Sequence, residues 1–116
     1  TSNTADTLKD RVHKILEKYN IEYSIDWENS AQPYITEKGF LVDAISRAIK
    51  DVTKITPDVS TTGGTSDGRF ISKICDQVIE FGPINASIHK IDEHVAIKDV
   101  EKLKEIYKLT LVNLLS

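Results

Sequence analysis

Residues 57–81 read PDVSTTGGTSDGRFISKICDQVIEF, and this stretch decides the fold class that the sequence predicts. Its first part, 57–61, is typical of a short strand that leads into a glycine bend. A short helix is predicted from Gly68 to about Ile74, and a second strand at 77–81. A strand, a turn, a helix and another strand in this order are typical of α/β proteins.

Longer elements are predicted on both sides of this stretch. Apolar residues at every third or fourth position predict helices near 4–20, 38–52 and 97–115. Residues 21–27 alternate between apolar and polar side chains, which predicts a strand with one wet face. The apolar faces expected to be buried on the second and third of these helices are Leu41, Ala44, Ile45, Ala48, Ile49 and Val52, and Val100, Leu103, Ile106, Tyr107, Leu111 and Leu114. The whole order predicts an α/β fold.

Composition narrows the class of protein. A chain of 116 residues has room for one domain with a modest core. The net charge of −3 gives no reason to expect nucleic acid or an anionic membrane as partner, and no apolar run reaches the length of a membrane span. Cys75 is the single cysteine, which favours a reducing compartment, the cytoplasm. Methionine is absent even at position 1, so Thr1 follows a trimmed initiator or tag, or lies inside a longer polypeptide.

The glycine bend is the first candidate site. Gly63 and Gly64 allow close approach of a ligand to the backbone, and Thr65 adds a hydroxyl donor just before the predicted helix. These features favour an anion cradle, for a carboxylate or a phosphate, although the bend lacks the Gly-Lys-Ser/Thr ending of a phosphate-binding loop. Arg69 could pair with a carboxylate or with a surface acid. Asp67 is expected to cap the helix, and the plain alternative for the bend is a turn without a ligand.

His89 is the second candidate, because it follows an uncharged stretch. A neutral imidazole is the commonest metal ligand in proteins, but a lone histidine is more often a hydrogen-bonded structural residue. If the segment is helical, Glu93 shares a face with His89 and could orient its ring. No His-x-Asp pair and no adjacent glutamates are present, so the chain supplies no complete zinc site from recognisable motifs.

Two ordered stretches carry a resemblance to a known family. GGTSDGRFI at 63–71 and EFGPINASIHK at 80–90, followed by Glu93, resemble the carboxyl-terminal part of the M20 family of di-zinc metallohydrolases. The resemblance implies that residues 1–32 end a lid (dimerisation) domain. It also implies that residues 33–116 form the carboxyl-terminal part of a zinc-exopeptidase-like catalytic domain.

The same resemblance implies roles for single residues. His89 matches a zinc ligand of the family. The positions that match contacts to the substrate are Gly64, Thr65 and Asn85. The candidates for supporting these groups are Glu93, Asp67 and Arg69. The family's catalytic glutamate, bridging aspartate and other ligands have no counterpart here, so no catalytic residue is expected in this chain. Relatives often carry glycine where Thr62 stands, which leaves the conformation of the bend open.

The activity that the resemblance implies is hydrolysis of N-succinyl-LL-2,6-diaminopimelate to succinate and LL-2,6-diaminopimelate, on the route to lysine. It would need two zinc (or cobalt) ions in a full-length homodimer, and this chain alone would be inactive. A different class of function stays open: a stand-alone module that binds an anion or a partner without catalysis. A structural fragment that binds no ligand is the third possibility.

Overall fold

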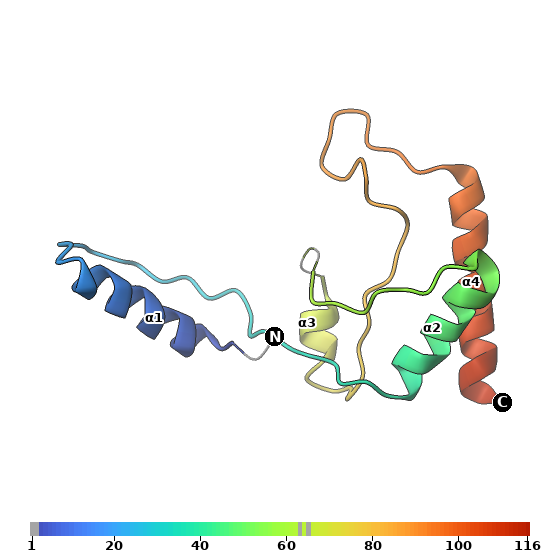
Figure 1. Cartoon of the computed structure of the whole chain (residues 1–116), viewed down its shortest axis with the longest axis horizontal. Helices are drawn as coiled ribbons and strands as arrows, with labels where there is room; N and C mark the ends of the chain where they lie inside the picture. The colour runs from blue at the N-terminus through green and yellow to red at the C-terminus, as the bar shows by residue number, and fades with distance from the viewer. Residues whose placement is uncertain (1–2, 63, 65) are drawn as a thin grey trace. The chain divides into compact units, whose positions relative to one another are not determined.

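The computed structural model describes residues 3–62, 64 and 66–116, and these residues form four helices joined by turns and extended segments (Figure 1). The helices are α1 (Ala5–Lys18), α2 (Phe40–Thr53), α3 (Gly68–Ile71) and α4 (Ile97–Leu115). The chain divides into two compact units, which are described separately below. The first contains the residues up to Ile35 together with Thr61–Asp76, and the second contains Thr36–Ser60 together with Gln77–Ser116.

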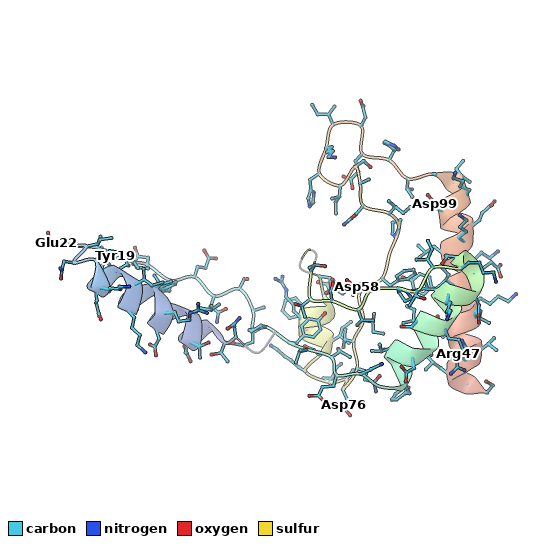
Figure 2. All side chains as sticks on the ribbon, viewed as in Figure 1. Tyr19, Glu22, Arg47, Asp58, Asp76 and Asp99 are labelled. Carbon is cyan, nitrogen blue, oxygen red and sulfur yellow. The ribbon has the colours of Figure 1, made fainter. Side chains whose placement is uncertain are left out.

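Helix α1 begins and ends where the sequence predicts. The Thr4 hydroxyl accepts a hydrogen bond from the Thr7 backbone N–H at 3.2 Å, and the Thr7 hydroxyl accepts one from the Thr4 N–H at 2.9 Å. This reciprocal pair satisfies two backbone donors that would otherwise lack partners at the helix start. After the helix, Asn20 takes a left-handed φ of 50°, which asparagine tolerates well. Tyr19 and Glu22 lie at this turn (Figure 2).

The segment after the turn runs back along α1 and contacts it through aromatic side chains. His13 Nδ1 and the Tyr23 hydroxyl share a hydrogen bond of 2.6 Å, and the Trp27 ring meets the His13 ring edge-on at 5.8 Å. Lys9 Nζ lies 5.8 Å from the centre of the Trp27 ring. These contacts leave the apolar face of α1 uncovered, because no residue of α1 is buried and Ile15 is 53% exposed.

The predicted strands at 21–27, 57–61 and 77–81 are not confirmed. In the part of the chain that the structure describes, these segments belong to neither a helix nor a strand. The α/β prediction therefore fails at the level of the sheet, since the described fold is helical. The physical reason is that a strand forms only when a neighbouring strand pairs with its backbone. Alternating polarity indicates only which face of the segment is suited to burial.

The core of the second unit lies where α2 and α4 pack side by side (Figure 1). Ile45 and Ala48 of α2 contact Ile106 of α4, and these side chains are 7%, 0% and 3% exposed. The partly buried side chains packed around them are Ile49, Val52, Ile79, Phe81 and Leu109. The face predicted for α2 is thus confirmed at its centre.

The face predicted for α4 is correct at Ile106 and in part at Leu103 and Leu114, which are half-buried, but it is wrong at its other positions. Tyr107 and Leu111 were expected inside but are 43% and 57% exposed, whereas Thr110 is 6% exposed. The Thr110 hydroxyl donates to the Ile106 carbonyl at 2.8 Å, and Asn113 Nδ2 donates to the Ala44 carbonyl of α2 at 3.3 Å. Polar side chains can face a neighbouring helix when their hydrogen bonds are satisfied, and a count of apolar residues cannot reveal this.

Side chains also connect the start of α2 to residues far along the chain. The Thr36 hydroxyl donates to the Val78 carbonyl at 2.5 Å and accepts from the Val78 N–H at 3.0 Å. The Leu41 N–H at the start of α2 donates to Gln77 Oε1 at 2.9 Å. A Cβ on Gly39 would lie 2.4 Å from Gln77 Nε2, so the absence of a side chain at Gly39 makes room for this cap.

None of the helices in the described residues combines the length and the apolar character that crossing a bilayer requires.

Candidate functional site

The glycine bend belongs to the first unit, and its described part is open. Gly64 is exposed, and a Cβ built on it would meet no heavy atom within 4 Å. Gly63 and Thr65 lie outside the described residues, so the predicted role of Thr65 stays a prediction. The space around Gly64 is compatible with a ligand close to its backbone.

The helix that follows the bend is shorter than the sequence predicts. It ends at Ile71 rather than near Ile74. Asp67 occupies the position before the helix, but its side chain makes no capping hydrogen bond. The Ser66 hydroxyl accepts from the Gly68 N–H at 3.0 Å instead. The capping role expected of Asp67 is therefore wrong, and its carboxylate is exposed to solvent, where it repels rather than attracts an anion.

Arg69 packs against an aromatic ring. Its guanidinium carbon lies 4.7 Å from the centre of the Phe70 ring, and the ammonium of Lys73 lies 5.9 Å from the same ring. Arg69 Nε is buried and has no hydrogen-bond partner among the described residues. A guanidinium stacked on a ring keeps its hydrogen-bonding edge for an acceptor, so the predicted pairing of Arg69 with a carboxylate is chemically open.

His89 lies in a loop of consecutive turns in the second unit, between residue 84 and the start of α4. The Ile88 N–H donates to the Asn85 carbonyl at 3.1 Å, and the Lys90 N–H donates to the Ser87 carbonyl at 3.0 Å. His89 itself has a left-handed φ of 59°. The helical geometry considered for this segment is thus wrong, since a helix cannot continue through a residue in this conformation.

Glu93 contacts the backbone of His89 rather than its ring. Glu93 Oε2 accepts a hydrogen bond from the His89 backbone N–H at 3.3 Å. The expected contact between this carboxylate and the imidazole is therefore not observed. The His89 side chain is exposed, and within the described part of the chain no hydrogen bond or ring contact engages it.

Ser87 closes the same loop. Its hydroxyl donates to the His94 carbonyl at 2.8 Å and accepts from the His94 N–H at 3.1 Å. His94 Nδ1 in turn lies 2.7 Å from the Asp92 carbonyl, and Lys90 Nζ donates to the Ala86 carbonyl at 2.7 Å. The loop is therefore fixed by its own side chains. An open hollow of about 430 Å³ beside it is lined in part by Asp99 at the start of α4, but neither Asn85 nor His89 lines it.

A single imidazole does not make a metal site. Structural and catalytic zinc ions take at least three protein ligands. Among the described residues no group of three or more histidines, cysteines, aspartates or glutamates is arranged to hold a metal ion. Within the described residues, His89 is therefore a single exposed imidazole and not a metal site.

The predicted site residues fall into two groups. Gly64, Asp67 and Arg69 belong to the first unit, whereas Asn85, His89 and Glu93 belong to the second. Within the second, the turns bring all three into one loop. Sequence reasoning missed Ser87, for which the available signal is the tendency of serine hydroxyls to bond nearby backbone in turns.

Comparison with known proteins gives a consistent result. The profile of peptidase family M20/M25/M40 matches residues 1–113. A protein of Nitrosomonas europaea named succinyl-diaminopimelate desuccinylase is 59% identical over 115 residues, which cover 99% of this chain and 31% of that protein. Proteins of the same name from Nitrosomonas eutropha and Bordetella avium are 56% and 55% identical, and the chain covers 30% of each. The chain thus spans about a third of the length of the relatives it matches, and it belongs to peptidase family M20/M25/M40.

Proposed function

We propose that this chain is part of a metal-dependent amide hydrolase that converts N-succinyl-LL-2,6-diaminopimelate to succinate and LL-2,6-diaminopimelate in lysine biosynthesis. The observation that carries the proposal is the 59% identity, over 99% of the chain, to a protein named for this activity. The exposed imidazole of His89, fixed on a loop of turns, supports it.

His89 would supply one metal ligand in this proposal. Its ring is exposed and unengaged in the described residues, as a ligand must be before a metal arrives. Zinc or cobalt ions, two per complete site, would polarise the amide carbonyl of the substrate and lower the pKa of bound water. Glu93 would help to hold His89 through the backbone hydrogen bond described above.

Other residues would place the substrate. The amide of Asn85 can donate to or accept from a polar group of the substrate. Gly64 and Thr65 would approach a substrate carboxylate from the bend, with Arg69 presenting its guanidinium edge. Asp67 would support the residues of the bend without contacting the anion, since its carboxylate is exposed and does not cap the helix.

The organisation of the complete enzyme is part of the same proposal. Residues 1–32 would end a lid (dimerisation) domain, and residues 33–116 would belong to the catalytic domain. The uncovered apolar face of α1 supports a partner surface in a homodimer, because exposed apolar stripes mark interaction sites. We propose the cytoplasm as the compartment, because the single cysteine of this chain, Cys75, is an exposed free thiol.

The chain alone is expected to be inactive, so the test uses a hybrid enzyme. In this hybrid, the matching segment of the Nitrosomonas europaea relative is replaced by this chain. We expect the hybrid to release succinate from N-succinyl-diaminopimelate and to bind zinc. His89→Ala should lower kcat/KM by more than about 100-fold, beyond the loss typical of a residue that only supports a ligand. Lys104→Ala, at an exposed position of α4, is the control and should leave zinc content and rate unchanged.

Zinc content and rate at wild-type level in the His89→Ala hybrid would refute the assignment of His89. Lack of activity in a folded, zinc-loaded wild-type hybrid would refute the substrate. The alternative of an anion-binding module is supported by the unpartnered Arg69 Nε in the described residues. That alternative predicts heat of binding when the 116-residue chain is titrated with succinate in the absence of metal, whereas a catalytic fragment predicts none.

A further inference from the structure

We propose that Ser87 is a positioning residue, whose hydroxyl fastens the loop that carries His89 and thereby fixes the direction in which the imidazole is presented. The inference rests on the proposed function, because in that function His89 binds a metal ion. It adds a residue that the family resemblance and the comparisons do not assign.

The first argument is the geometry of the Ser87 side chain. One hydroxyl engages both backbone polar groups of a single residue, with 2.8 Å to the His94 carbonyl oxygen and 3.1 Å from the His94 N–H. The two residues are seven positions apart, so these bonds close a short ring of backbone. His89 lies inside this ring, two positions after Ser87.

The second argument is the backbone conformation that the ring contains. His89 and Asp92 have φ values of 59° and 63°, both in the left-handed region. Residues with a Cβ visit this region at an energetic cost and stay there only when the surroundings hold them. Several hydrogen bonds lie within this loop, among them those of Lys90 to Ser87 and Ala86 and that of the His89 N–H to Glu93. The Ser87–His94 bonds are the ones that enclose both left-handed residues. Without the hydroxyl, the left-handed turns lose their closure.

The third argument is that the same device holds a different junction in this unit. The Thr36 hydroxyl also donates to the carbonyl and accepts from the N–H of one residue, Val78. There it joins the segment before α2 to residue 78, across 42 positions. In this unit, a hydroxyl that bonds both the N–H and the carbonyl of one residue therefore connects two segments of backbone. The Ser87 hydroxyl makes this connection in the loop that contains His89.

The experiment compares Ser87→Ala, which removes both bonds, with Ser87→Thr, which keeps the hydroxyl. Ser24→Ala, an exposed serine in the first unit, is the matched control. Amide hydrogen exchange of residues 88–94 is measured in the 116-residue chain without metal. Zinc affinity, kcat, KM and the visible absorption of the cobalt-loaded protein are measured in the hybrid enzyme, and far-UV circular dichroism verifies the fold of each variant.

For Ser87→Ala we expect faster exchange of the His94 amide, zinc affinity lower by roughly 10- to 100-fold, and a cobalt spectrum altered in the direction of the His89→Ala spectrum. We expect kcat to fall more than KM changes. Ser87→Thr should restore each value to within about threefold of wild type, which a loss caused by general unfolding would not do.

The outcomes separate this inference from the function on which it rests. If His89→Ala loses zinc while Ser87→Ala keeps wild-type affinity and spectrum, the positioning role is overturned and the function stands. If His89→Ala keeps its zinc, the ligand assignment falls and the role of Ser87 falls with it. If both variants lose affinity and Ser87→Thr recovers it, the proposal is supported.

Discussion

Helices α1 and α2 have the same length, 14 residues, and both have an apolar face, but only the apolar face of α2 is buried. Helix α2 buries Val42, Ala44, Ile45 and Ala48, whereas α1 buries no residue. The difference is the partner, because α2 packs on α4 and α1 is accompanied only by an extended segment. An amphipathic pattern therefore specifies a helix and a face, and the presence of a complementary surface decides whether that face is buried. The buried apolar side chains of the described residues all belong to α2 and α4.

The comparison predicts that the largest loss of stability follows substitution of Ile106, which is 3% exposed at the centre of the α2–α4 contact. Ile106→Ala should lower the free energy of unfolding by about 2–5 kcal/mol, because it removes buried methyl groups and leaves a cavity. Urea unfolding followed by circular dichroism at 222 nm measures the change. Ile97→Ala, on the same helix but 81% exposed, is the control and should change little. Equal losses in the two variants would contradict a core at this contact.

The same contrast explains how far the sequence predicted the fold. The bounds of α1 depend on local chemistry, the Thr4 cap and the left-handed Asn20, and the predicted range of 4–20 agrees with them. The inward face of α4 depends on α2, and it was misassigned at Tyr107 and Thr110 because the packing against α2 decides which side chains are covered. The Thr110 hydroxyl is satisfied within its own helix, by the Ile106 carbonyl. The strand at 21–27 was predicted from alternation alone, and the backbone partner that a strand needs is not in the pattern.

The candidate site follows the same division. The sequence singled out His89, but the alternative of a helical segment assigned the wrong atom to Glu93, which bonds the backbone of His89 rather than its ring. The left-handed conformation of His89 made the difference, and no spacing rule indicates it at a histidine. Ser87 was missed because its partner, His94, is chosen by the turn geometry that the bond itself helps to create.

An intermediate effect is expected where a distant side chain completes α2. Gln77→Ala should cost about 1 kcal/mol, the usual value for a lost helix cap, because the Leu41 N–H loses its acceptor. Gly39→Ala should cost a similar amount, since the new Cβ would displace the Gln77 amide. The double variant should then be less destabilised than the sum of the two, and unfolding of all four proteins in urea gives this coupling. Strict additivity would show that Gln77 does not cap α2 in solution.

The smallest effect is expected on the face of α1. Ile15 is 53% exposed, so Ile15→Ala should change the free energy of unfolding by no more than about 0.5 kcal/mol in the isolated chain. The urea transition of the monomeric protein, verified by sedimentation, tests this. A loss of more than about 1 kcal/mol would exceed the change typical of an exposed residue. It would mean that the α1 face is covered in solution, and the contrast with α2 would then disappear.

The cap on α2 also has a consequence for how the chain is made. The acceptor for the Leu41 N–H is 36 residues further along the chain. Ribosomes add roughly 5–20 residues each second, so several seconds pass between the synthesis of α2 and that of its cap, whereas a helix forms in about a microsecond. During this interval the apolar face of α2 has neither its cap nor α4. Helix α2 therefore has both its cap and its packing partner only after the chain beyond residue 97 has been made.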